Sequence, residues 1–310
     1  MAIPIVECVP NFSEGRDRAV VESLASAIAG VSGVRVLDIE MDADHNRSVI
    51  TCAGAPEAVV DAAVAAARVA VNRIDLTRHQ GVHPRIGALD VLPFVPIEGV
   101  DLEDCAALAW RAGLRLWEEL GLPVYFYEAA AKRPERRRLE DVRRGQFEGL
   151  REAALADPAR RPDVGGPGLH PTAGATAVGA RKVLIAWNIN LDTDDVETAR
   201  AIARAIRASS GGLPCVKALG VRLASRGVAQ VTMNLTDFET TPMHVVYEAV
   251  LREAKARGAG ILSSEIIGLL PRKAIEMAAS HFLKFENFRA ETVLERRLEE
   301  AAAQPLSSKE

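Results

Sequence analysis

The chain has few cysteines and no long apolar run. Cys8, Cys52, Cys105 and Cys215 lie far apart and form no C-x-x-C pair, so we expect small buried hydrophobic side chains. No uninterrupted apolar segment approaches the length of about 20 residues that crosses a membrane. The N-terminus has no basic region and reaches an acid too early for a signal peptide. The sequence therefore predicts a cytoplasmic protein without a membrane partner or disulfides.

An excess of basic residues is also missing. The 38 Lys and Arg residues against 42 Asp and Glu residues give a net charge of −4, which argues against a dedicated nucleic-acid binder. The hydrophobic share of 48% and the charged share of 26% are typical of an ordered globular chain with a sizeable core. The one strong basic run, residues 132–138 with Arg143 and Arg144, is typical of a solvated helix face. It could also attract a polyanionic substrate tail.

Apolar periodicity predicts the same order of elements, β-α-β-β-α-β, in both halves of the chain. In the first half we expect strands over residues 3–9, 34–40, 48–53 and 88–95, and helices over residues 13–30 and 56–74. In the second half we expect strands over residues 182–190, 216–223, 228–235 and 261–267, and helices over residues 193–207 and 242–258. The repeat predicts an α/β chain of two ferredoxin-like subdomains, each with a four-stranded sheet covered by helices on its outer side.

We place the N-terminal subdomain at residues 1–177, the C-terminal subdomain at residues 178–300 and a tail at residues 301–310. Between the two repeats the pattern favours helices over residues 102–120 and 139–156, a strand over residues 124–127, and a Gly/Pro-rich loop over residues 163–175. Beyond Phe288 we expect a charged helix with a frayed end.

Polar residues concentrate in residues 78–85, which read RHQGVHPR and lie between an apolar helix and an apolar strand. Loops held by rigid elements often carry catalytic groups, and histidine suits general acid–base work. The alternative is a polar surface loop with helix-capping histidines. A zinc site needs three or four ligands, and Gly81 and Pro84 interrupt the helix that would align His79 with His83. We therefore expect no metal.

Two further segments could contribute to a site. The acidic turn with Glu40, Asp42, Asp44 and His45 is either a solvated hairpin tip or a source of carboxylates for a cationic substrate group. The glycine-rich segment at residues 165–174 lacks the spacing of a dinucleotide fold or a P-loop. It is either a flexible linker or a binding segment for a planar heterocycle.

Five motifs together resemble the glutamate formimidoyltransferase family. They are VECVPNFSEG at residues 6–15, NRSV at 46–49, HQGVHPRIGALD at 79–90, GARK at 179–182 and NINL at 188–191. The resemblance covers the chain from Ile3 to about Leu298. It implies transfer of a formimino group from N-formimino-L-glutamate to N5 of tetrahydrofolate in histidine degradation. It also implies a homodimer, a substrate groove between the subdomains, and tetrahydrofolate, possibly polyglutamylated, as co-substrate without metal or nucleotide.

The resemblance assigns the catalytic acid–base role to His83, while His79 is expected to support the loop. The acid that assists this histidine in the family is usually Asp. Glu40 stands at its position here, with Asp42 as a substitute. The resemblance also assigns folate binding to Gly165, Gly166, Pro167, Gly168, Leu169, His170, Pro171, Thr172, Ala173 and Gly174.

Three arginines, Arg47, Arg85 and Arg181, are candidates to clamp substrate carboxylates. We expect Gly174→Val to weaken folate binding and to leave thermal stability largely intact. The competing functions are a glutamate formyltransferase that uses 5-formyltetrahydrofolate, and a folate-binding module without turnover.

Overall fold

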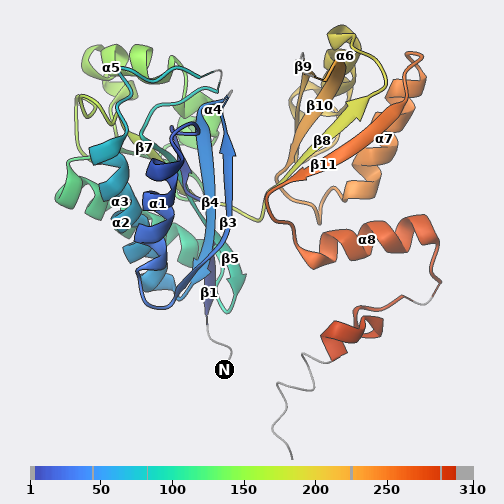
Figure 1. Ribbon diagram of the computed structural model, residues 1–310, viewed down its shortest axis with the longest axis horizontal. Helices are drawn as coiled ribbons and strands as arrows, with labels where there is room; N and C mark the ends of the chain where they lie inside the picture. Colours follow the sequence, from blue (N-terminus) through green and yellow to red (C-terminus); the bar gives the residue numbers. More distant parts are fainter. Residues whose placement is uncertain (1–3, 44, 82, 224–225, 287, 298–310) are drawn as a thin grey trace, which may run out of the picture. The chain divides into compact units, whose positions relative to one another are not determined.

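A computed structural model describes residues 4–43, 45–81, 83–223, 226–286 and 288–297 (Figure 1). The chain divides into two compact units between residues 182 and 183, and each unit is described by itself. The predicted α/β class is confirmed, since each unit combines helices with one sheet. Within the described ranges, no helix is both long and apolar enough to span a membrane.

The first unit begins with the predicted β-α-β-β-α-β order. Its first elements are β1 (Ile5–Cys8), β2 (Asn11–Phe12), α1 (Arg18–Ala29), β3 (Val34–Asp42), β4 (Arg47–Gly54), α2 (Pro56–Arg73) and β5 (Leu89–Glu98). Strand β3 pairs with β4, β4 pairs with β1 and β2, and these two pair with β5, all in antiparallel fashion. Short β1 and β2 together take the place of one first strand.

The same unit then extends its sheet. The added elements are α3 (Leu102–Leu120), β6 (Val124–Glu128), α4 (Leu139–Val142), α5 (Gln146–Ala156) and β7 (Thr176–Ala180). Strand β7 lies parallel between β5 and β6. The prediction of a four-stranded sheet is therefore wrong for this unit, which has a seven-stranded sheet. The predicted helix over residues 139–156 is also interrupted, because Gly145 adopts a φ of +89° between α4 and α5.

Helix boundaries in this unit follow local chemistry. The Asp17 side chain accepts hydrogen bonds from the backbone of Ala19 and Val20 and begins α1. Pro56 stands at the first turn of α2, as predicted. Helix α3 begins with a capping box between Asp101 and Asp104 and ends before a left-handed glycine, which gives the predicted bounds.

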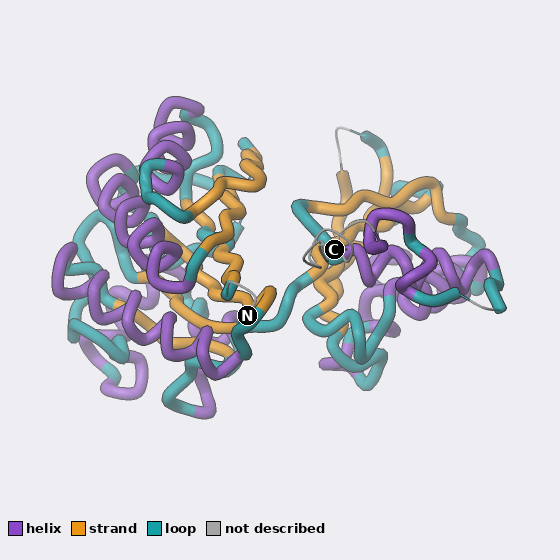
Figure 2. The backbone as a smooth tube through the Cα atoms, turned by 90° about the horizontal axis from the view of Figure 1, so that it is seen from below, coloured by secondary structure: helices purple, strands orange, loops and turns teal. Residues whose placement is uncertain are grey.

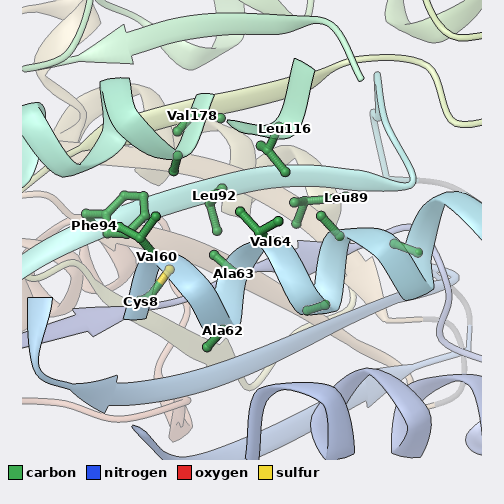
Figure 3. Packing of buried hydrophobic residues seen from close by; sticks show 14 of the residues in the cluster. Cys8, Val60, Ala62, Ala63, Val64, Leu89, Leu92, Phe94, Leu116 and Val178 are labelled. Carbon is green, nitrogen blue, oxygen red and sulfur yellow. The ribbon is translucent and has the colours of Figure 1, made fainter. Parts of the chain in front are cut away.

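The main core of the first unit lies between its sheet and helices α1, α2 and α3. The alanine-rich face of α2 lets Val60 and Val64 approach strand β5, where Leu92 and Phe94 are buried (Figure 3). A smaller cluster of buried hydrophobic residues lies on the other face of the sheet, where helices α4 and α5 pack over β5, β6 and β7. Of the four cysteines, three are buried as expected and Cys215 is half-buried.

The second unit contains β8 (Ile185–Leu191), α6 (Val196–Ile206), β9 (Val216–Leu223), β10 (Val228–Leu235), α7 (Met243–Lys255), β11 (Ile261–Ile267) and α8 (Arg272–Leu283). Its sheet has four antiparallel strands in the order β11-β8-β10-β9, which confirms the prediction. In Figure 2 the helices of this unit lie together on one side of its strands. Helix α8 was not expected. The charged helix predicted beyond Phe288 lies partly outside the described residues, and residues 294–297 within them are helical.

Candidate active site

The histidine loop (residues 75–88) connects α2 to β5 and is fixed near both ends by the segment before β7. The backbone N–H of Leu76 donates to the carbonyl of Thr172 at 2.8 Å, and that of Ala88 donates to the carbonyl of Ala173 at 2.9 Å. The glycine segment (residues 165–174) therefore ends directly against the histidine loop. Two regions that the sequence singled out separately are brought together in the first unit.

His79 supports this loop through both of its ring nitrogens. Nε2 lies 2.9 Å from the Asn46 carbonyl, which can only accept, so Nε2 carries the proton. Nδ1 then accepts a hydrogen bond from Arg85 Nε at 3.1 Å. Burial lowers the pKa of His79, which agrees with this neutral, doubly bonded ring. Both nitrogens are thus occupied by protein groups, as expected of a supporting residue.

Asn46 joins three segments at the base of the site. Its Oδ1 accepts a hydrogen bond from the backbone N–H of Gly15 at 3.0 Å, and its Nδ2 donates to the Gln80 carbonyl at 3.0 Å. Gly81 packs beside it so closely that a Cβ there would lie 2.2 Å from the carbonyl oxygen of His45. A glycine at residue 81 is required for this approach.

His83 has a different environment. Its Nδ1 donates to the carbonyl of Pro84 at 2.8 Å, since the carbonyl can only accept. In the neutral ring the lone pair is then on Nε2. Burial lowers the pKa of His83 to about 3, and the positive charges of Arg47 and Arg143 act in the same direction. The imidazole is therefore neutral near pH 7 and able to accept a proton.

A buried ion network explains the charge beside His83. Asp90 is fully buried, and its Oδ2 accepts from Arg47 Nη1 at 2.7 Å and from Arg143 Nη2, while its Oδ1 accepts from the backbone N–H of Ile86 at 2.8 Å. Burial alone would raise the pKa of Asp90, but the Arg143 and Arg47 guanidinium groups lower it to about 2. Arg47 also donates to Asn11 Oδ1 at 2.7 Å. The carboxylate is thus charged and fixes two cations at the site.

Sequence reasoning missed the roles of Asp90, Arg143 and Asn11. Asp90 was the one acid in an otherwise apolar predicted strand, and this was the signal that could have found it. Arg143 belonged to the basic run that was interpreted as a solvated helix face, yet only 12% of its side chain is exposed.

The three arginines proposed as carboxylate clamps lie in different surroundings. Arg47 is held by Asp90 and Asn11, as described above. Arg85 is buried, and its two terminal nitrogens donate to the carboxylate of Glu148 on α5 at 2.8 and 2.7 Å. Arg181 follows β7, donates to the Lys182 carbonyl at 3.0 Å and faces the half-buried Glu7. Burial raises the pKa of Glu7, and the charge of Arg181 opposes that shift.

The two candidate carboxylates lie on the last residues of β3. Strand pairing sets Glu40 opposite Val49 and Asp42 opposite Arg47, so both acids share a sheet face with Arg47. The Asp42 carboxylate lies 2.6 Å from Nδ1 of His45. The ring of His45 in turn lies edge-on to that of His83, with 6.0 Å between centroids. Asp42 therefore reaches the catalytic candidate through His45. Asp44 and Val82 lie outside the described residues.

The glycine segment combines tightly packed ends with an open middle. A Cβ on Gly165 would lie 2.5 Å from the ring of Trp117, and one on Gly174 would lie 2.1 Å from the carbonyl oxygen of Ile86. Gly174 also has a φ of +71°. A Cβ on Gly168 would meet only the Leu155 side chain, at 3.7 Å. The expectation that Gly174→Val spares stability is therefore wrong, because residue 174 is a packing and backbone requirement.

His170 holds the turn within the glycine segment. Its Nδ1 accepts hydrogen bonds from the backbone of Ala173 at 3.0 Å and of Thr172 at 3.4 Å. Gly166, Pro167 and Pro171 are exposed and Gly168 is half-buried, whereas Leu169 packs against the hydrophobic core. In the described part of the chain, no three His, Cys, Asp or Glu side chains are arranged to hold a metal ion.

Comparison with known proteins covers both units. A model of the formiminotransferase domain, N-terminal subdomain, matches residues 5–181, and a formiminotransferase domain model matches residues 186–302. Glutamate formimidoyltransferase from Streptococcus pyogenes serotype M1 is 45% identical over 284 residues, which span 92% of this chain and 95% of that protein. The protein of the same name from Thermoplasma acidophilum is 46% identical over 300 residues, or 96% and 98% of the two chains. Formimidoyltransferase-cyclodeaminase from Gallus gallus is 46% identical over 288 residues, which span 91% of this chain and 53% of that protein.

Proposed function

The chain belongs to the formiminotransferase family, and we propose that it transfers the formimino group of N-formimino-L-glutamate to N5 of tetrahydrofolate. The products are 5-formiminotetrahydrofolate and L-glutamate, a step of histidine degradation. The observation that carries this function is the neutral, half-buried imidazole of His83 beside the Arg47–Asp90–Arg143 network.

The chemistry requires a base that is uncharged at neutral pH. N5 of tetrahydrofolate is a neutral nucleophile, and it must lose a proton after it attacks the formimino carbon. The glutamate nitrogen must gain a proton before it leaves. His83 meets the first requirement because its Nδ1–H is bonded to Pro84 and its Nε2 lone pair is available.

We propose that Gly166, Pro167 and Gly168 of the glycine segment contact the folate, because the segment ends against the histidine loop and these residues carry little side-chain bulk. Gly165, His170, Ala173 and Gly174 would then shape the segment from within. Gly168→Val is the appropriate test, since the site has room for the added atoms. It should raise the folate Kd while leaving the melting temperature within a degree or two of the parent. An unchanged Kd would argue against this assignment.

Among the arginines, we propose that Arg181 contacts a substrate carboxylate and that Arg85 mainly supports the loop through Glu148 and His79. Arg47 would hold charge beside His83 while remaining bonded to Asp90. Arg181→Gln should therefore raise the KM for the glutamate substrate more than Arg47→Lys does. Equal KM values for Arg181→Gln and the parent would remove Arg181 from the binding site.

We also propose a cytoplasmic homodimer that accepts polyglutamylated tetrahydrofolate. Light scattering on the purified protein tests the dimer, and a monomer at micromolar concentration would contradict it. The activity itself is tested by mixing protein, tetrahydrofolate and N-formimino-L-glutamate and following 5-formiminotetrahydrofolate. A matched reaction with 5-formyltetrahydrofolate and L-glutamate measures formyl transfer. Turnover only in the second reaction would replace the proposed donor, and binding without turnover in either would leave a folate-binding module.

A further inference from the structure

The proposed reaction moves two protons, and the structure sets two imidazoles beside one another. The ring centroids of His45 and His83 lie 6.0 Å apart with an interplanar angle of 82°. They come from different parts of the first unit, His45 from the turn between β3 and β4 and His83 from the histidine loop. At this separation both rings can reach the same small substrate group.

Their electrostatic surroundings are opposite. The His45 ring pairs with the Asp42 carboxylate at 2.6 Å, and the backbone N–H of His45 donates to the other oxygen of Asp42 at 2.8 Å. A carboxylate at Nδ1 favours a proton on that nitrogen and orients the ring. His83 instead faces the guanidinium groups of Arg47 and Arg143, which oppose a second positive charge there.

We propose that the two histidines divide the proton transfers, with His83 as the base toward N5 of tetrahydrofolate and His45 as the acid toward the departing glutamate nitrogen. This inference rests on the proposed function and deepens it. It also gives Asp42 a definite role, because Asp42 acts as a positioning residue for His45 rather than for His83.

In the proposed step, N5 forms a bond to the amidinium carbon, and the π electrons move onto the terminal nitrogen. His83 Nε2 takes the proton from N5. The lone pair of the terminal nitrogen then re-forms the C=N bond, the bond to the glutamate nitrogen breaks, and that nitrogen takes the Nε2 proton of the His45 imidazolium. The site begins with charged His45 and neutral His83 and ends with the charges exchanged. A proton passed from His83 to His45, directly or through water, resets it.

Changing the leaving group distinguishes two mechanisms: proton transfers divided between His83 and His45, and both transfers made by His83 alone. N-Formimino-4,4-difluoro-L-glutamate releases a less basic amine, because fluorine withdraws electrons, and so depends less on an acid. His45→Gln should lower kcat about 10²–10⁴-fold with the ordinary donor, in the range of a lost general acid. With the difluoro donor the loss should shrink at least about tenfold. His83→Asn should show the same loss with both donors.

The matched control is His281→Gln in the second unit. His281 is also an exposed histidine paired with an acid, since its Nε2 lies 2.9 Å from Glu248, but it belongs to α8 and to none of the motifs that resemble the family. Its kcat should equal that of the parent with both donors. Asp42→Asn provides a second variant and should reproduce the donor dependence of His45→Gln in weaker form.

The outcomes are distinguishable. No turnover of the ordinary donor by the parent protein would overturn the proposed function itself. Normal turnover by the parent, with either a near-normal kcat for His45→Gln or an equal loss on both donors, would overturn only the division of roles. Circular dichroism of each variant shows whether it is folded. If His45→Gln does not fold, the donor dependence of Asp42→Asn tests the division of roles instead.

Discussion

The two units share an order of elements and a strand order, yet their polar residues do different things. In the first unit, buried charges converge on Asp90 beside a titratable ring. In the second, the two buried polar side chains of the network are amides: Gln230 donates to Asn190 at 2.9 Å. Asn190 donates at 3.0 Å both to Ser263 and to Glu265, a half-buried acid that pairs with Arg226. The same β-α-β-β-α-β frame thus supports fully buried charge in one case and a buried amide pair in the other.

The difference arises from the elements that the first unit adds after β5, from α3 to β7. Arg143 follows α4, Glu148 lies on α5, and Thr172 and Ala173 precede β7. All four contact the histidine loop or the network beside it, and the second unit has α8 after its last strand instead. The site therefore depends on residues that the repeated frame does not contain.

The largest effect is expected at the junction of that addition with the histidine loop. Gly174→Val introduces a β-branched residue at a φ of +71° and a Cβ 2.1 Å from the Ile86 carbonyl oxygen. Backbone strain costs about 1–3 kcal/mol, and overpacking adds about 1–3 kcal/mol. Urea unfolding should show a loss within the sum of these terms, whereas Gly168→Val in the same segment should lose little. Equal stability of the two variants would show that the junction is not tightly packed.

The next effect concerns the charged network. Asp90→Ala leaves the guanidinium groups of Arg47 and Arg143 without their shared carboxylate. Breaking a buried ion pair by removing one partner typically costs about 3–5 kcal/mol, so the urea midpoint should fall sharply. A loss of unfolding free energy below about 1 kcal/mol would place the ion pairs of Asp90 in the range of exposed ion pairs. It would also weaken the contrast between the two units.

A smaller effect is expected from the amide network of the second unit. Asn190→Ala removes a partner of Gln230, Ser263 and Glu265, and unsatisfied buried polar groups cost about 1–3 kcal/mol. The expected loss is therefore smaller than that of Asp90→Ala in the same urea assay. If Asn190→Ala were the more damaging change, the amide network would stabilise the fold more than the Asp90 ion network.

The smallest effect is a dependence of stability on acidity. The Arg143 and Arg47 charges hold the pKa of Asp90 at about 2, below its ordinary value of 3.8. A depressed pKa stabilises the folded state above pH 4, and this contribution is lost as the pH falls toward 2. The difference in unfolding free energy between the parent and Asp90→Asn should therefore narrow over that range. A difference that stays constant from pH 7 to pH 2.5 would mean that Asp90 titrates alike in both states.

Much of the frame could be predicted from local pattern. Helix α3 and strands β9, β10 and β11 have the predicted bounds, because apolar periodicity, caps and turns are local signals. Strand β7 was missed because its residues Thr-Ala-Val-Gly-Ala are small and it pairs in parallel with strands distant in sequence. Helix α8 was missed because its only buried residue is Ala274, so its apolar pattern does not follow a core.

The site was predictable only in part for a similar reason. The motif at residues 78–85 supplied His79, His83 and Arg85, which are neighbours in the chain. The partners that define their roles are distant: Asp90 lies 43 residues from Arg47 and 53 from Arg143, and Glu148 lies 63 from Arg85. Such pairings are set by the fold, and no local pattern carries them.

The central claim is that His83, and not His79, is the base that accepts the proton from N5 of tetrahydrofolate. The most direct test compares kcat and folate Kd for His83→Asn and His79→Asn with N-formimino-L-glutamate as donor. We expect His83→Asn to lower kcat about 10²–10⁴-fold with a nearly unchanged folate Kd, because the imidazole acts on a proton. His79→Asn, which disturbs contacts to Asn46 and Arg85, should lower kcat much less. A near-normal kcat for His83→Asn, or a greater loss for His79→Asn, would contradict the account.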